Sequence, residues 1–152
     1  MKADVEAIFS KVDFINRYKK ISESNQRDCG MPYQVKKKEL IELFQKCGFN
    51  DIKYFSEDKY YQVEYINISN DLSVSLNFYL RWEEVDFVLD IHSAKEVIKI
   101  NGPFGYVAQK LGERNFIRRP CFCSKDELYS IIADCISLYK DLKSNLLKLD
   151  RS

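Results

Sequence analysis

Apolar and polar residues alternate along two neighbouring stretches near the middle of the chain, from residue 72 to 82 and from 85 to 92. Successive side chains of a strand point to opposite faces of a sheet, so this alternation predicts two antiparallel strands with one apolar and one polar face. Glu83 and Glu84 are expected to form the tight turn between them. The apolar face would carry Leu72, Val74, Leu76, Phe78, Leu80, Trp82, Val85, Phe87, Leu89 and Ile91.

Two further strands are predicted upstream, where aromatic and β-branched residues dominate residues 52–56 and 60–68. Alternation along the second of them places Tyr61, Val63 and Tyr65 on one face. Downstream, residues 96–100 are expected to add an edge strand before the chain turns at a Gly-Pro pair.

Helical periodicity predicts helices around this sheet, and the last of them is the best defined. Ser124 and Glu127 fit a capping box at its start, and apolar residues recur along its whole length. A long apolar stripe of this kind should lie across the apolar face of the sheet. The predicted helices cover residues 3–21, 34–47, 104–111 and 124–149.

The order of these elements predicts a single α+β domain over residues 1–152. Its sheet would be an antiparallel β-meander of four to five strands covered by helices, including a long C-terminal helix. The parts are a helical N-terminal segment (1–48), the antiparallel sheet (51–100) and the C-terminal helices (103–149).

Composition limits the function classes without selecting one. The chain is 45% hydrophobic and 31% charged with a formal net charge of +1, which is ordinary for a globular domain and gives no overall attraction to nucleic acid. No apolar run approaches the roughly 20 residues that cross a bilayer, and residues 1–9 lack the apolar core of a signal peptide. We therefore expect a cytoplasmic protein without membrane association, whose five cysteines are free thiols.

Candidate catalytic groups are few. His92 follows Asp90 on the polar face of its predicted strand and could act as a general base, but no serine or cysteine is placed by a motif as a nucleophile. Cys121 and Cys123 lack a second pair of ligands at a zinc-binding spacing. The residues therefore predict no enzyme, no metal and no cofactor, and basic and aromatic residues are not interleaved as a nucleic-acid platform requires.

A contact surface is the remaining candidate. The polar face and turn of the central hairpin collect Glu83, Glu84, Asp86 and Asp90. Another acidic pair occupies the preceding predicted turn, at residues 57–58, and the two turns would form one acidic patch if they lie at the same end of the sheet. Such a patch suits a basic partner, and ordinary solvated turns are the alternative.

Several features together resemble small bacterial immunity proteins, the antidotes of contact-dependent growth inhibition and other polymorphic toxin systems. These are an N-terminal helical segment, a tyrosine-rich antiparallel meander, a turn into a short helix and a distinctive entry into a long last helix. The two sequence stretches that carry the resemblance are Gly102-Pro103-Phe104 and Pro120-x-Phe122-x-Ser124-x-x-Glu127-Leu128.

The resemblance implies a non-enzymatic protein that binds and neutralises one cognate toxin domain, often a nuclease. Acidic residues would then take the place of the phosphates of the substrate. The partner-binding residues that we expect from the surface argument are Glu83, Glu84, Asp86 and Asp90, with Tyr79 and Tyr65 as anchors. The alternative is a small ligand-binding or regulatory domain, or a small enzyme, that uses His92 and the arginines near Pro120 in a cavity between sheet and helices.

Overall fold

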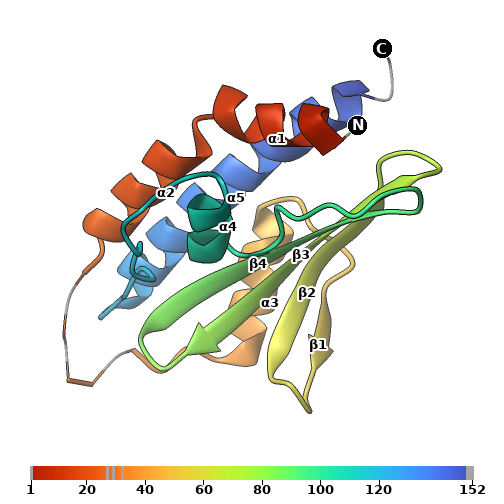
Figure 1. The fold of residues 1–152 in the computed structure, drawn as a ribbon. Coiled ribbons are helices and arrows are strands. Elements are labelled where there is room, and N and C mark those ends of the chain that lie inside the picture. Colours follow the sequence, from red (N-terminus) through yellow and green to blue (C-terminus); the bar gives the residue numbers. More distant parts are fainter. Residues whose placement is uncertain (1, 27, 29, 32, 150–152) are drawn as a thin grey trace.

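The structure is a computed structural model that describes residues 2–26, 28, 30–31 and 33–149, so expectations for Met1, Cys29 and Pro32 lie outside it. Within these residues an antiparallel sheet packs against a layer of helices (Figure 1). The strands are β1 (Lys53–Phe55), β2 (Tyr60–Asn67), β3 (Leu72–Arg81), β4 (Glu84–Ser93) and β5 (Gly102–Pro103). The helices are α1 (Lys2–Lys11), α2 (Phe14–Glu23), α3 (Lys37–Lys46), α4 (Phe104–Lys110) and α5 (Lys125–Leu149).

Each strand pairs antiparallel with its neighbour in sequence, in the order β1-β2-β3-β4-β5. The predicted α+β class, with a meander of up to five strands and a long C-terminal helix, is therefore confirmed. In β3 and β4 the register pairs Leu76 with Leu89 and Phe78 with Phe87, so the predicted apolar positions share one face.

That apolar face is the one the helices cover. The Phe44 ring of α3 lies 5.2 Å from the Phe78 ring, and the Phe104 ring of α4 lies 5.8 Å from the Phe87 ring. The apolar stripe of α5 is buried from Leu128 to Leu146, as its helical periodicity predicted, and Ile136 is a further buried position that the predicted stripe lacked. No described helix covers the opposite side of the sheet, which we call the open face (Figure 1).

The N-terminal helix is two helices rather than the predicted one. The break falls at Asp13, whose backbone adopts the left-handed conformation at φ 56°. Asp tolerates this conformation better than most residues because its short side chain bonds locally, and here Asp13 Oδ1 accepts a hydrogen bond of 2.9 Å from Asn16. The bend lets Phe9 and Phe14 pack edge to face with ring centroids 5.4 Å apart.

A β-bulge overturns the predicted faces of β2. Gln62 lies opposite Asn77 but Glu64 lies opposite Leu76, so the register shifts by one residue between them. The shift turns every later side chain to the other face. Tyr61 and Val63 are buried, but Tyr65, which was predicted to share their face, is 60% exposed on the open face.

The central hairpin turns one residue earlier than predicted. Its strands end and begin at the paired residues Arg81 and Glu84, so Trp82 and Glu83 form the turn. Trp82 adopts φ 59°, the left-handed conformation that the first position of such a turn demands. It is 67% exposed and contributes nothing to the apolar face to which alternation assigned it.

The predicted edge strand at residues 96–100 does not form. A side chain replaces it, because the Asn101 amide donates to the Ile91 carbonyl at 2.9 Å and its oxygen accepts from the Ile91 N–H. The short strand β5 then pairs with Val88 and Leu89. The Asn101 side-chain amide and the two residues of β5 therefore cover this part of the β4 edge in place of a full strand.

One cysteine also differs from expectation. Cys123 is disulfide-bonded, whereas Cys47, Cys121 and Cys135 are free thiols. Cys135 lies within the buried stripe of α5, as its position in the helical pattern predicted. A disulfide depends on which residues folding brings together, which spacing alone does not reveal.

Candidate functional site

The turns before β2 and before β4 lie at the same end of the sheet, as the acidic-patch hypothesis required. Strand pairing places Phe55 opposite Tyr60, and Tyr61 opposite Phe78. Continuing that register by one residue brings Tyr60 beside Tyr79, close to the end of β3. We call this part of the open face the hairpin end.

Three aromatic rings form a ladder across the hairpin end. The rings of Phe55 and Tyr60 are 4.8 Å apart and 13° from parallel. Those of Tyr60 and Tyr79 are 5.1 Å apart and 20° from parallel. The Arg81 guanidinium continues the ladder 5.1 Å from the Tyr79 ring. Together with the exposed Trp82, these side chains give the hairpin end the residue types that dominate binding energy at protein interfaces.

The loop before α5 attaches to the edge of β4 at this end of the sheet. Val85 donates its N–H to the Pro120 carbonyl at 2.9 Å, and Phe122 donates to the Glu83 carbonyl at 3.0 Å. Glu84 and Cys121 form an antiparallel bridge. The same register two residues further places Arg119 opposite Asp86, so their side chains share the open face.

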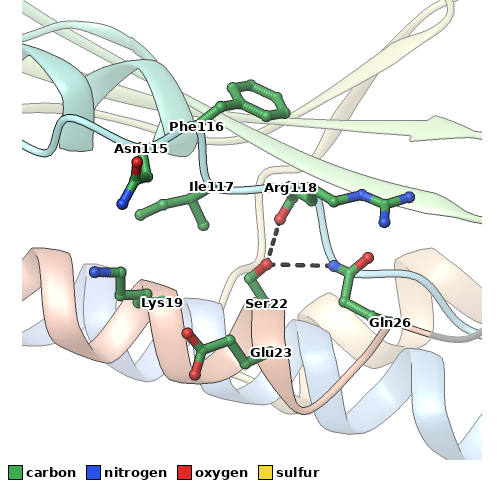
Figure 2. A pocket seen from close by; sticks show the side chains of 8 residues that line it. All are labelled: Lys19, Ser22, Glu23, Gln26, Asn115, Phe116, Ile117 and Arg118. Atoms are coloured by element: carbon green, nitrogen blue, oxygen red, sulfur yellow. Dashed lines mark hydrogen bonds between the residues drawn. The ribbon is translucent and has the colours of Figure 1, made fainter.

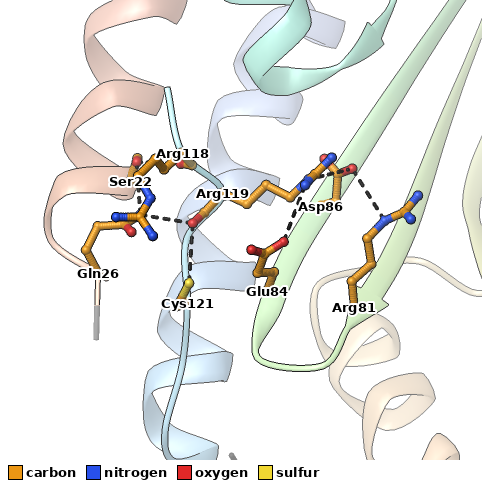
Figure 3. Close-up of polar contacts among 8 residues, drawn as sticks. All are labelled: Ser22, Gln26, Arg81, Glu84, Asp86, Arg118, Arg119 and Cys121. Atoms are coloured by element: carbon orange, nitrogen blue, oxygen red, sulfur yellow. Dashed lines mark hydrogen bonds and ion pairs between the residues drawn. The ribbon is translucent and has the colours of Figure 1, made fainter. Parts of the chain in front are cut away.

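An ionic cluster results from this pairing (Figure 3). Arg119 contacts the carboxylates of Asp86 at 3.2 Å and Glu84 at 3.3 Å, and Arg81 lies 4.0 Å from Asp86. The contact between Arg119 Nε and Asp86 is an ion pair without hydrogen-bond geometry, and neither Asp86 oxygen has a hydrogen-bond partner among the described residues. Burial raises the pKa of the Asp86 carboxyl above its usual range, although both arginines act to lower it.

The hypothesis of an acidic contact patch needs correction at two of its four carboxylates. Asp86 is 1% exposed and cannot meet a partner directly, and Glu84 is paired with Arg119. Alternation placed Asp86 on the polar face correctly, but it could not reveal that an arginine 33 positions later covers that carboxylate. Glu83 lies in the turn, and Asp90 is exposed further along β4.

Of the two predicted anchors, the structure places Tyr79 in the ladder and Tyr65 on the open face of β2. Sequence reasoning missed Phe55 and Tyr60, which complete the ladder. Phe55 and Tyr60 are aromatic residues that directly flank the turn at residues 56–59. That placement was the signal that could have identified them as neighbours on adjacent strands.

The alternative of a cavity that uses both His92 and the arginines is not supported. His92 lies opposite Ser73, whereas Arg119 contacts Asp86, six positions closer to the hairpin turn. Six residues of a strand span roughly 20 Å. The His92 side chain is exposed on the open face, and it makes no hydrogen bond or ion pair with another described residue.

A hollow of about 400 Å³ lies between α2 and the loop at residues 115–118 (Figure 2). Its polar groups are largely engaged in holding that loop in place. Ser22 donates to the Arg118 carbonyl at 2.5 Å, and Gln26 donates to Ser22 at 3.2 Å and to the Arg119 carbonyl at 2.9 Å. These bonds fix the loop that carries Arg119, so this side of the hollow supports the ionic cluster.

The described parts of the chain contain neither a candidate membrane-spanning helix nor a candidate metal-binding cluster. No helix there combines the length and apolar character that crossing a bilayer requires, and no three His, Cys, Asp or Glu side chains gather where they could share a metal ion. Comparisons with protein-family models, curated proteins and solved structures found no match to this chain.

Proposed function

We propose that this protein is a non-enzymatic immunity protein that binds and neutralises a cognate toxin domain, such as a nuclease, in the cytoplasm. The resemblance of the sequence to such antidotes supplies the class of partner. The hairpin end supplies the contact surface, with Trp82, Glu83 and the aromatic ladder at its centre.

The observation that carries this proposal is the exposure of Trp82 beside the stacked rings. A tryptophan at a strained turn position, 67% exposed, does nothing for the core and is available to a partner. Trp, Tyr and Arg are the residue types enriched among interface hot spots, because they contribute large contact areas with few rotatable bonds.

The same geometry favours a protein over a single-stranded nucleic acid. The faces of Tyr60 are covered by Phe55 and Tyr79, whose near-parallel rings lie 4.8 Å and 5.1 Å from it, centroid to centroid, within the range of offset stacking. Bases bind by stacking on free ring faces, and this ladder offers ring edges instead. Binding to a toxin should accordingly survive moderate salt, whereas phosphate-dominated binding would fall steeply with salt concentration.

The decisive experiment uses the toxin domain encoded directly upstream of this gene, because an antidote gene is expected to follow the gene of its toxin. Co-expression with this protein should restore growth, and the two chains should co-purify. Failure of both rescue and co-purification would remove the proposal. Loss of a measured enzymatic or ligand-binding activity in a His92→Ala variant would instead favour the alternative of an enzyme or ligand-binding domain.

Substitution of Trp82 by alanine should weaken toxin binding by about 30-fold, the equivalent of about 2 kcal/mol for a hot-spot residue. Phe116 provides the matched control because it is 64% exposed but lies on the loop beside α2. The Phe116→Ala variant should bind within about twofold of the unmodified protein. Affinities measured by calorimetry decide the matter, and equal losses in both variants would exclude the hairpin end as the contact surface.

A further inference from the structure

The outer edge of β2 is paired along only part of its length. β1 pairs with Tyr60, Tyr61 and Gln62 and then ends. The remaining residues of β2, from 63 to 67, pair with β3 on one side but with no described strand on the other. The bulge that follows Gln62 is where the chain of β1 and the edge of β2 diverge.

The direction of the backbone groups on this edge follows from one hydrogen bond. The Ile68 N–H donates to the Leu72 carbonyl at 2.8 Å, so it points toward β3. Backbone groups of a strand alternate in direction, which turns those of Ile66 toward β3 and those of Tyr65 and Asn67 toward the free edge. Neither Tyr65 nor Asn67 makes a backbone hydrogen bond to a described residue outside the sheet.

A groove of about 370 Å³ runs beside this edge, between residues 48–53 and β2. Phe49 is buried there. The one carboxylate that the bulge directs toward the helices, Glu64, accepts a hydrogen bond of 2.5 Å from Tyr139 and contacts Lys143 at 3.0 Å through both oxygens. Its charge is therefore matched from within the protein.

We propose that an extended segment of the partner protein adds to β2 as a further strand beside Tyr65 and Asn67. It would pair with the part of the β2 edge that β1 does not cover. The two residues present N–H and C=O groups about 7 Å apart, and the backbone of an extended peptide offers acceptors and donors at that same spacing. An apolar side chain of the added strand would pack on the exposed Tyr65 ring, on the same open face as the hairpin end.

This inference rests on the proposed function, because it takes the toxin domain as the source of the segment. It adds the mode of recognition: main-chain pairing along β2, with the Tyr65 ring as the side-chain contact. Tyr65 and Tyr60 lie on one strand and one face, so a single partner can reach both the edge and the hairpin end.

The test replaces Asn67 by proline, which removes the N–H that faces the free edge and leaves the pairing with β3 intact. Binding to the toxin domain should weaken at least about tenfold. The matched control is Asn67→Ala, which keeps the N–H and should bind within about twofold. Equal affinities for the two variants, with Trp82→Ala still impaired, would overturn the inference and leave the proposed function standing.

Hydrogen exchange in the unmodified protein gives a second measurement that does not depend on how the proline variant folds. The Tyr65 and Asn67 amides should exchange at least about tenfold more slowly in the complex than in the free protein. The Phe116 amide, on the loop beside α2, serves as the control. Unchanged exchange at both edge amides in a formed complex would overturn the inference, and absence of any complex would end both proposals together.

Discussion

Replacing Arg119 with methionine is expected to lower the free energy of unfolding by about 3 kcal/mol, because it leaves the Asp86 carboxylate buried without its principal counter-charge. This value is at the low end for breaking a buried ion pair. The Arg119 side chain is 36% exposed, and Arg81 remains 4.0 Å from the carboxylate. Urea denaturation of the variant and the unmodified protein measures the difference.

The neighbouring Arg118 provides the control. Its backbone carbonyl holds the loop against Ser22, but its side chain is exposed, so Arg118→Met should change stability by no more than about 0.5 kcal/mol. The double variant Arg119→Met with Asp86→Asn should recover part of the loss, since it removes both charges. Equal effects of the two single arginine substitutions would contradict an energetic role for the ionic cluster.

The ionic cluster also predicts how stability depends on pH. Burial raises the pKa of Asp86 in the folded protein above its ordinary value of 3.8, so the folded state holds this proton at a pH where the unfolded chain has released it. Its contribution to stability therefore falls as pH rises from the unfolded pKa to the folded one. As pH rises above the ordinary Asp value of 3.8, the Asp86→Asn variant should lack this fall. Parallel pH profiles for the two proteins would contradict the prediction.

Replacing Leu89 with alanine is expected to lower the free energy of unfolding by about 2–5 kcal/mol, through lost burial and the cavity left behind. Leu89 is fully buried at the centre of β4, opposite Leu76 and on the side of the sheet that the helices cover. The next residue, Asp90, is exposed on the open face, and Asp90→Ala should cost no more than about 0.5 kcal/mol. Thermal or urea unfolding of the pair measures both, and similar small losses would show that the face assignment is wrong.

The contrast between Leu89 and Asp90 shows what alternation alone can establish. In β3 and β4 the period of two is unbroken, and every apolar position from Leu72 to Leu80 and from Val85 to Ile91 was assigned to the correct face. In β2 both candidate faces carry aromatic or β-branched residues, Tyr61, Val63 and Tyr65 on one and Tyr60 and Ile66 on the other, so the alternation does not reveal an inserted residue. The bulge was therefore invisible, and Tyr65 was grouped with Tyr61.

The site was less predictable than the fold because its parts come from distant segments. Sequence pattern placed the acidic residues, Tyr79 and Tyr65 on the strands and their turn, but the charge that balances Asp86 and Glu84 comes from Arg119 on an irregular loop. Sequence pattern assigns a residue to a face of a strand. It does not show which loop later runs along the edge of that strand.

Three different devices occupy the edge of β4: the loop at residues 120–122, the short strand β5 and the amide of Asn101. None of them is a long strand, yet together they leave few backbone groups on that side for another chain to pair with. The edges of this sheet are consequently unequal, one sealed by its own chain and one half open at β2. Main-chain pairing with another protein would therefore be confined to the β1–β2 side of the sheet, since the chain itself closes the β4 side.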